Sequence, residues 1–423
     1  MATKLQAPKG TLDTLPAESG KWQAIEQIAR DVAATFNFKE IRTPVFEHSE
    51  LFHRGVGETS DMVKKETYDF KDRGDRSLTL RPEGTAGVVR AMIEHGLLND
   101  QGARAKVFYI GPNFRYERPQ KGRYHIHHQF GVEAFGVAEP EQDVECMLLQ
   151  LHFYRRAGLK DLSLRVNSLG DRESKQRYRD ALVAFFTPTR ELLSEDSQRR
   201  LDENPLRILD SKDPRDVAAR EGAPSATASL SEKSKAHFDR VVSLLQQAGA
   251  AFEIDNHLVR GFDYYTDTLW EVTASGLGSQ SAVGGGGRYD NLVEQLGGRP
   301  TPGVGFGSGL ERLLLALEAQ QVALPDSQKP LVWIAYHGDA AKTEALSLAR
   351  ELRDAGLRVD LDLGGRGMKA QLRMADREHA STTLLLGEDE MAKEVVLVKS
   401  FTTGDQAVVS RPTLLVQLTK PSS

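Results

Sequence analysis

Four glycines alternate with other residues in one segment, Pro302–Arg312, which reads PGVGFGSGLER. They are Gly303, Gly305, Gly307 and Gly309. If this segment is a strand, one whole face of it has no side chains. Glycine inside a strand costs stability, so four in register indicate that something flat lies close against the backbone. The segment does not fit G-x-G-x-x-G, and the chain contains no G-x-x-x-x-G-K-[ST], which excludes the folds that depend on those two phosphate-binding motifs.

The composition is that of an ordinary globular protein with more than one domain. A chain of 423 residues exceeds the size at which one core usually stops growing, about 250 residues. Its 60 acidic and 55 basic residues give a formal charge of -5, so any nucleic-acid surface must be a local patch. The single cysteine, Cys146, excludes an internal disulfide and a cysteine-based zinc site. No signal-peptide core or membrane-length apolar run is present, so we expect a cytoplasmic protein without membrane contact.

The patterns along the chain predict two domains. Residues 1–325 mix helices and strands and include an antiparallel hairpin over 107–135, whose strands flank a short basic loop. Residues from about 171 to 251 are dense in charge and helical in periodicity, which predicts a helical insertion. Residues 323–330 have the composition of a linker. Residues 331–423 alternate strand and helix patterns, as in a small α/β domain.

The hairpin predicts a polar face with open space on it. In its second strand Gln129 and Glu133 point to the same side with only Gly131 between them, and in its first strand Arg115 and Glu117 share a face. Such a face could hold a small zwitterion that has polar groups in its side chain. It could also be the solvated face of a hairpin, which the pattern alone favours.

The histidines of the second strand raise the question of a metal. A zinc site needs several ligands at fixed spacing, and the sequence offers neither cysteines nor a second histidine cluster. We therefore expect no metal site built on cysteines. We expect His128 to be packed or hydrogen-bonded within the core.

Further candidate residues lie beside the glycine-rich segments. Arg312 begins the helix after the four glycines, where its guanidinium could grip a phosphate or lie in solvent. The run GGGGRYDNL, from Gly284, could be a flexible linker, although the strand and helix patterns around it favour a close approach of other groups to the backbone. Glu83 and Thr85 precede another helix, which Thr85 could simply cap.

Two basic features of the sequence could be explained by exposure to solvent alone, without any ligand. In the stretch VRGFDYYT, Arg260 stands ahead of two tyrosines where a strand begins, and a solvated loop would look the same. In the last domain, four basic residues spaced by three, four and four positions form one helical stripe. They are Arg366, Lys369, Arg373 and Arg377. A solvated helix face explains such a stripe, and so does a contact with RNA.

Taken together, these segments resemble the histidyl-tRNA synthetase family of class II aminoacyl-tRNA synthetases over essentially the whole chain. The extended segment around Ile41–Phe52 is similar to motif 1, FRYERPQKGRYHIHHQFGVEAFG to motif 2, and GVGFGSGLERLLLALE to motif 3. VRGFDYYT and AVGGGGRYDNL resemble the two histidine-specific signatures. The resemblance implies an α+β catalytic domain with a mostly antiparallel sheet, a helical insertion, and a C-terminal α/β anticodon-binding domain.

The resemblance also implies an activity: histidine and ATP, with Mg²⁺, give histidyl-adenylate, and the histidyl group then passes to the 3' end of its tRNA. Arg115 would bind the α-phosphate and Arg312 the γ-phosphate end of ATP, with Gly305 and Gly307 beside the nucleotide. Arg260 would supply positive charge at the α-phosphate, so that Arg115 and Arg260 are the implied catalytic residues. The ligands of the Mg²⁺ ion stay undefined.

A second set of residues would bind histidine. It comprises Glu83, Thr85, Gln129, Glu133, Tyr264 and Tyr265. The first three would hold the α-amino group, while Glu133 and Tyr265 would take the two imidazole nitrogens. Buried polar partners of this kind reject substrates that lack the matching group by a factor of roughly 10⁴.

The implied partners are tRNA(His), L-histidine and a second copy of the chain, in a homodimer built largely on motif 1. The implied tRNA contacts are Arg118, Gln120, Lys121 and Arg123 in the motif 2 loop, and Lys369 and Arg373 on the helical stripe. The alternative is a catalytically inactive, histidine-binding regulatory paralogue in histidine biosynthesis. Such a paralogue is not expected to keep both VRGFDYYT and a complete tRNA-binding domain. A sensor of uncharged tRNA would need a kinase segment, which the chain lacks.

Overall fold

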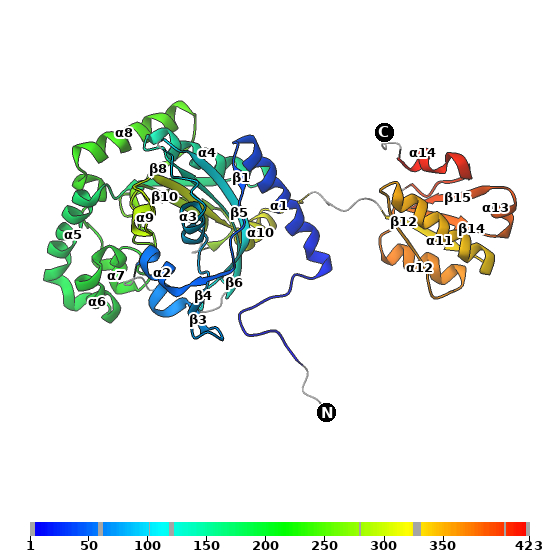
Figure 1. The fold of residues 1–423 in the computed structure, drawn as a ribbon, viewed down its shortest axis with the longest axis horizontal. Helices are drawn as coiled ribbons and strands as arrows, with labels where there is room; N and C mark the ends of the chain where they lie inside the picture. The colour runs from blue at the N-terminus through cyan, green and yellow to red at the C-terminus, as the bar shows by residue number, and fades with distance from the viewer. Residues whose placement is uncertain are drawn as a thin grey trace. The chain divides into compact units, whose positions relative to one another are not determined.

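The structure is a computed structural model, and it describes residues 5–57, 62–100, 102–117, 122–278, 281–324, 331–401 and 403–419. The chain divides into two compact units, Met1–Pro325 and Asp326–Ser423 (Figure 1). Most of the expected linker, from residue 325 to 330, lies outside the described residues. Among the helices that the structure describes, none is long and apolar enough to cross a membrane.

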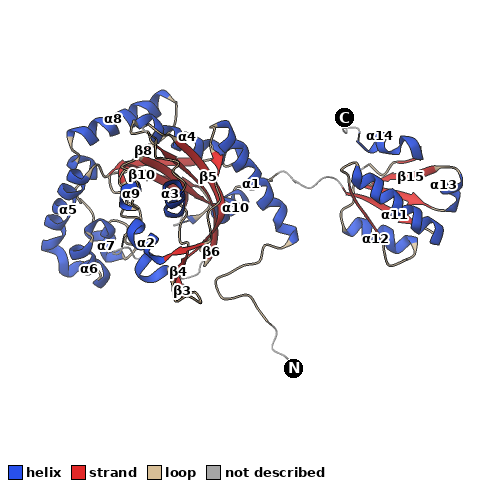
Figure 2. Ribbon diagram, in the orientation of Figure 1, coloured by secondary structure: helices blue, strands red, loops and turns tan. Residues whose placement is uncertain are grey.

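The first unit is built on an eight-stranded sheet in the order β1-β5-β6-β11-β10-β9-β7-β8 (Figure 2). Only the two outer pairs, β1 with β5 and β7 with β8, are parallel. The strands are β1 (Lys39–Glu40), β5 (Ala105–Phe114), β6 (Ile126–Phe135), β7 (Leu162–Ser168), β8 (Glu253–Ile254), β9 (Thr266–Ala274), β10 (Ala282–Arg288) and β11 (Gly303–Gly309). The predicted fold class is confirmed in this sheet, because every inner pair is antiparallel.

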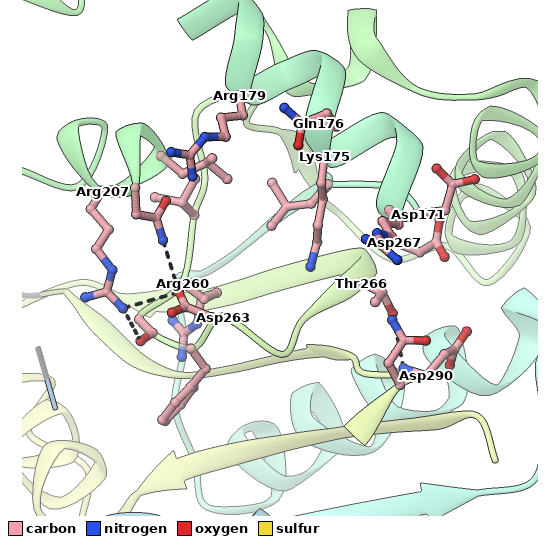
Figure 3. Close-up of a pocket in the computed structure, with 18 of the residues that line it drawn as sticks. Asp171, Lys175, Gln176, Arg179, Arg207, Arg260, Asp263, Thr266, Asp267 and Asp290 are labelled. Atoms are coloured by element: carbon pink, nitrogen blue, oxygen red, sulfur yellow. Dashed lines mark hydrogen bonds and ion pairs between the residues drawn. The ribbon is translucent and has the colours of Figure 1, made fainter. Parts of the chain in front are cut away.

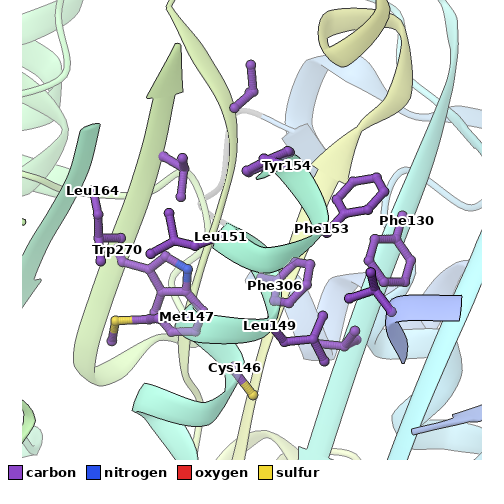
Figure 4. Packing of buried hydrophobic residues seen from close by; sticks show 14 of the residues in the cluster. Phe130, Cys146, Met147, Leu149, Leu151, Phe153, Tyr154, Leu164, Trp270 and Phe306 are labelled. Atoms are coloured by element: carbon purple, nitrogen blue, oxygen red, sulfur yellow. The ribbon is translucent and has the colours of Figure 1, made fainter. Parts of the chain in front are cut away.

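Each face of the sheet has its own core, because strand side chains alternate. On one face Phe130 and Val132 of β6 pack with Trp270 of β9 against α4 (Figure 4). On the other, Val107 and Tyr109 of β5 pack with α3 and the insertion. The helices outside the insertion are α1 (Pro16–Thr35), α2 (Ser49–Val56), α3 (Thr85–Glu94), α4 (Pro140–Arg156), α9 (Leu292–Gln295) and α10 (Leu310–Ala319). The second face is the one that carries the site.

Helices form the insertion between β7 and β8. They are α5 (Arg172–Phe186), α6 (Glu195–Glu203), α7 (Pro214–Ala219) and α8 (Glu232–Gln247), with single turns η2 (Thr187–Leu192), η3 (Pro205–Ile208) and η4 (Ala226–Ser229) between them. Side chains of Asp171, Ser194, Asp213 and Ser231 accept hydrogen bonds from the first turns of α5, α6, α7 and α8, which is the usual role of these residue types at a helix start.

A separate three-stranded sheet follows the first helix, in the order β2-β4-β3. Its strands are β2 (Phe46–His48), β3 (Tyr68–Lys71) and β4 (Ser77–Leu80), and η1 (Met62–Glu66) precedes β3. The expectation of an extended segment through Phe52 was wrong at its end, because α2 begins at Ser49 and buries Leu51 and Phe52. Hydrophobic burial at helical spacing outweighs the influence of Pro44, which lies outside the helix.

The second unit is a five-stranded sheet in the order β13-β12-β14-β15-β16, in which β12 is parallel to both its neighbours. Its elements are β12 (Leu331–Tyr336), α11 (Asp339–Asp354), β13 (Arg358–Leu361), α12 (Met368–Arg377), β14 (Thr382–Leu386), α13 (Glu388–Ala392), β15 (Val395–Ser400), β16 (Gln406–Ser410), η6 (Arg411–Thr413) and α14 (Leu414–Thr419). The predicted α/β character is confirmed, and the antiparallel strand β16 is added to it.

Candidate active site

A cavity of about 470 Å³ lies on the second face of the central sheet. Every residue predicted to hold histidine or ATP lines this cavity: Glu83, Thr85, Arg115, Gln129, Glu133, Arg260, Tyr264, Tyr265, Gly305, Gly307 and Arg312. Arg123 lines it too, whereas Arg118, Gln120 and Lys121 lie outside the described residues. The sheet register is what brings these distant segments together.

The floor of the cavity is glycine on two neighbouring strands. Gly305 and Gly307 of β11 pair with Gly287 and Gly285 of β10, so two adjacent strands present no side chains to the site. Neighbouring strands lie about 4.8 Å apart, so this opens a strip about two strands wide. The glycine run from Gly284 is therefore a strand and not a flexible linker.

The space beside the glycines is occupied in part by other side chains of the protein. A methyl group at Gly305 would clash with Glu133, and one at Gly307 with Gln129. At Gly303 the flat neighbour is the ring of Tyr289. On β10, a methyl group at Gly287 would lie 2.6 Å from the Tyr265 ring. The expectation of a flat group against these glycines is thus partly met by the protein's own side chains.

Glu133 stands at the centre of a ring of hydroxyl groups. Its Oε1 accepts hydrogen bonds from Thr85 Oγ1 at 2.7 Å and from Tyr109 at 3.2 Å, and its Oε2 accepts one from the Tyr289 hydroxyl. Burial raises the pKa of Glu133 to about 8, the hydroxyls of Tyr289 and Thr85 oppose this shift, and the nearby Glu83 adds to it. At neutral pH the carboxyl group therefore carries its proton for most of the time.

Glu83, and not Thr85, caps α3. Its carboxylate accepts the backbone N–H of Thr85 at 2.6 Å and that of Ala86 at 2.8 Å. The interpretation of Thr85 as the cap was wrong, because its hydroxyl points to Glu133 instead. Burial raises the pKa of Glu83, while these two backbone hydrogen bonds pull it down. The two carboxyl groups in the cavity therefore have different partners. Glu83 accepts backbone N–H groups at the start of α3, whereas Glu133 accepts hydroxyl groups.

Gln129 is held by a residue that the sequence patterns did not single out. Its side-chain oxygen accepts a hydrogen bond of 2.9 Å from Asn113, which is buried. The side-chain N–H₂ of Gln129 lies over Gly307. His127 lines the cavity on the same face, where burial lowers its pKa well below the usual range and the charge of Arg115 lowers it further. His127 is therefore a neutral ring.

Three arginines enter the cavity from three elements. Arg115 follows β5 and donates from Nε to the carbonyl oxygen of Pro82 at 2.8 Å. Arg260 pairs with Glu271 of β9 at 2.8 Å, and its guanidinium lies over Gly285. Arg312 of α10 donates to the carbonyl oxygen of Ala282 at 2.7 Å. Each guanidinium is thus oriented by a short contact, and its five N–H donors are of the kind that phosphate oxygens accept.

Aromatic rings stack along the loop that carries Arg260. Phe262 and Tyr264 are parallel, with ring centroids 5.1 Å apart, and the Tyr264 and Tyr265 centroids are 4.9 Å apart. Tyr264 also meets Tyr289 edge to face at 5.7 Å. Burial raises the pKa of Tyr265 to about 12, so its hydroxyl is neutral and can both donate and accept. The stretch is thus a packed wall of the cavity and not a solvated loop.

His128 lies on the opposite face of β6. Its Nδ1 is 3.0 Å from Oε1 of Glu311, and its backbone N–H donates to the same carboxylate at 2.8 Å. The side chain is hydrogen-bonded as expected, but it is 37% exposed and lies at the edge of the core. Among the described residues, no group of three or more His, Cys, Asp or Glu side chains is arranged to hold a metal ion.

The sequence patterns missed three residues that line the cavity, Tyr109, Tyr289 and Glu271, and Asn113, which holds Gln129. Tyr109 and Asn113 alternate along β5 on the same side as the site, so strand periodicity could have found them. Tyr289 stands two positions after the last residue of the glycine run, Gly287. Nothing in the local sequence shows that its hydroxyl reaches Glu133.

In the second unit, the basic stripe is exposed on α12 at Lys369, Arg373 and Arg377. Arg366 precedes the helix and pairs with Asp362 at 2.7 Å, so the stripe on the helix itself has three members instead of four. The exposed face of α12 thus carries three basic side chains and one acidic one, Asp376.

The chain is similar to known proteins in both of its units. The family model "Histidyl-tRNA synthetase" matches residues 10–313, and the model "Anticodon binding domain" matches residues 331–420. The histidine–tRNA ligase of Thermosynechococcus vestitus is 50% identical over 411 residues, covering 97% of this chain and 95% of the relative. That of Anoxybacillus flavithermus is 48% identical over 412 residues, 97% of each chain. The crystal structure of apo S. aureus histidyl-tRNA synthetase is similar with a TM-score of 0.83 and 38% identity, over 99% of this chain and 100% of that one.

Proposed function

The chain belongs to the histidyl-tRNA synthetase family, and on that premise we propose how the residues of its cavity divide the reaction. Its function is that of a histidine–tRNA ligase: it joins histidine to tRNA in an ATP-dependent reaction. The regulatory paralogue is disfavoured, because the similarity to ligases runs through both the catalytic and the anticodon-binding parts. The observation that carries the residue roles is the single cavity that gathers all the predicted histidine and ATP residues.

Histidine occupies the part of the cavity between β6 and the tyrosine loop. Glu83, Thr85 and Gln129 hold its α-amino group, since a carboxylate and two neutral oxygens suit an ammonium ion. Glu133 and Tyr265 take the two imidazole nitrogens, with Tyr264 closing the wall. Because Glu133 holds a proton at neutral pH, it offers the ring a donor as well as acceptor oxygens.

ATP occupies the part of the cavity that the arginines surround. Arg115 binds the α-phosphate and Arg312 the γ-phosphate end, because a guanidinium is a planar donor that matches phosphate oxygens. Gly305 and Gly307 belong to the floor beside the nucleotide. Mg²⁺ enters as the partner of the ATP phosphates, the usual manner of binding of this ion at nucleotide sites.

The chemical step is an attack of the histidine carboxylate on the α-phosphorus, with pyrophosphate leaving. It needs alignment and positive charge more than a protein nucleophile. Arg260 supplies charge at the α-phosphate, and its contact with Glu271 fixes its direction before substrate arrives. Arg115 acts on the same phosphate.

The experiment that tests this assignment is histidine-dependent exchange between ATP and pyrophosphate by the purified protein with Mg²⁺. Absence of exchange would refute the enzyme assignment. Arg260→His is expected to lower the rate of adenylate formation far more than the affinity for histidine. An equal loss in both would reduce Arg260 to a binding group.

We propose that tRNA meets both units. Arg123 lines the cavity, pairs with Glu117 at 3.1 Å, and with Arg118, Gln120 and Lys121 faces the acceptor end. Lys369 and Arg373, exposed on α12, contact the anticodon arm. The test of the α12 assignment is a charge reversal, described in the Discussion.

We also propose a cytoplasmic homodimer in which the three-stranded sheet contributes to the interface. Phe46 of β2 and Phe70 of β3 are 47% and 42% exposed and meet edge to face, and Val45 beside them is 40% exposed. Exposed aromatic side chains that contact each other are typical of an interface. Phe46→Asp is expected to shift the molecular mass in solution, measured by light scattering, from dimer to monomer. An unchanged mass for the variant would exclude this sheet.

A further inference from the structure

A second cavity, of about 940 Å³, lies between the helical insertion and the loop that carries the histidine-reading tyrosines (Figure 3). One wall comes from α5, α6 and η3, and the other from the loop and the start of β9. Val259, Arg260, Gly261 and Phe262 line this cavity and the active-site cavity alike. This loop therefore separates the two cavities, and we call Val259–Phe262 the partition. Contacts that the insertion makes to the partition affect the shape of the substrate site.

The insertion contacts the partition and the residues that follow it through Arg207, Asn204 and Lys175. Arg207 of η3 donates to the carbonyl oxygen of Gly261 at 3.0 Å, and Asn204 donates to the carboxylate of Asp263 at 3.1 Å. Lys175 of α5 points across the cavity (Figure 3), and its ammonium group donates to the backbone carbonyl oxygen of Tyr265. The contact of Lys175 is thus made to Tyr265, the residue that we assign to an imidazole nitrogen of histidine.

The surroundings of Lys175 mark it as more than a surface lysine. Burial lowers its pKa to about 8, while the charges of Asp263 and Asp267 work in the opposite direction. A half-buried ammonium group costs solvation energy, which its hydrogen bond to the carbonyl and the two nearby carboxylates must offset. The side chain does not line the active-site cavity, so it acts on substrate only through the loop.

We propose that Lys175 is a positioning residue for histidine recognition. By holding the carbonyl oxygen of Tyr265, it sets how far the Tyr264–Tyr265 pair reaches into the active-site cavity, and it thereby couples the insertion to amino-acid binding. This rests on the proposed role of Tyr265 in binding the imidazole. If the Lys175 contact served only to attach the insertion, its loss would lower the stability of the fold without a selective change in the KM for histidine.

The test is pyrophosphate exchange with the full-length chain, comparing Lys175→Met, Lys175→Arg and the control Lys233→Met. Lys233 lines the same cavity and is exposed. For Lys175→Met we expect the KM for histidine to rise about 10-fold to 100-fold, as for loss of a charged hydrogen bond, with the KM for ATP changed less than about twofold. Lys175→Arg should recover most of the histidine affinity, and Lys233→Met should resemble the unsubstituted chain.

An unchanged KM for histidine in a folded Lys175→Met variant would overturn the proposal, as would an equal rise in the KM for ATP. Lys175→Gln keeps a donor without the charge and provides the same comparison if Lys175→Met melts below the assay temperature. If the unsubstituted chain shows no exchange, the proposed function itself fails. If it exchanges normally and the Lys175 variants bind histidine normally, only the role of Lys175 fails.

Discussion

The glycine at position 305 should be one of the least replaceable residues of the central sheet. A methyl group there would lie closer than 3.0 Å to two groups, the carboxylate of Glu133 and the carbonyl oxygen of Val132. Ordinary contacts of this kind begin at 3.4 Å, so the carboxylate oxygen and the carbonyl oxygen must each move away by more than about 1 Å. The carboxylate can turn, but the carbonyl belongs to the backbone of β6, which pairs with β11 at this position.

Overpacking of this kind typically costs about 1–3 kcal/mol, and we place Gly305→Ala at the upper end because backbone must move. For a large domain, each kcal/mol lowers the melting temperature by roughly 2–4 °C, so a fall of about 6–12 °C is expected. The displaced Glu133 should also raise the KM for histidine. Calorimetric melting and pyrophosphate exchange measure the two effects.

Two other glycines of the same strand provide the comparison. In Gly307→Ala the methyl group meets only the end of the flexible Gln129 side chain, so the stability loss should be smaller while the KM for histidine still rises. In Gly309→Ala the nearest atoms are 3.9 Å away, in Arg312, so stability should be unchanged. If Gly305→Ala melts within about 1 °C of the unsubstituted chain, the clash has been relieved and the reasoning is refuted.

Three further predictions concern charge. The pKa of Glu133 in the fold, about 8, lies above its ordinary value of 4.5. Its contribution to stability is therefore fully present below about pH 4.5, falls as the pH rises from there, and is lost above about pH 8. Glu133→Gln should gain stability relative to the unsubstituted chain as the pH rises from about 5 to about 8, and parallel melting curves over that range would contradict this. Asp143→Asn removes the fully buried carboxylate that pairs with the fully buried Arg288 and leaves that arginine only the part-exposed Asp290; it should cost roughly 3–5 kcal/mol in urea unfolding, whereas a loss below about 1 kcal/mol would show that the pair is dispensable. Arg373→Glu should raise the KM for tRNA about tenfold at low salt and leave pyrophosphate exchange intact; unchanged tRNA kinetics would make the stripe a solvated face.

Local pattern was enough to predict much of this protein. The alternation in 126–135 placed Gln129 and Glu133 on one face, as the register with β5 and β11 shows. The glycine period in β11 predicted a bare strand face, and the order of the motifs identified the family and the fold class. These inferences succeed because side-chain direction in a strand depends on the local backbone alone.

The tertiary structure decided which groups meet. Tyr109 and Tyr289 are 24 and 156 positions from Glu133, yet both hydroxyls reach it. Glu83 caps a helix that Thr85 seemed suited to cap, and Lys175 crosses from the insertion to Tyr265. Such contacts depend on how strands pair and how an inserted domain packs. The sequence determines which side chains lie together on one face of a helix or strand. Which other side chains that face contacts, and whether a buried carboxyl group keeps its proton, are determined only when the elements pack together.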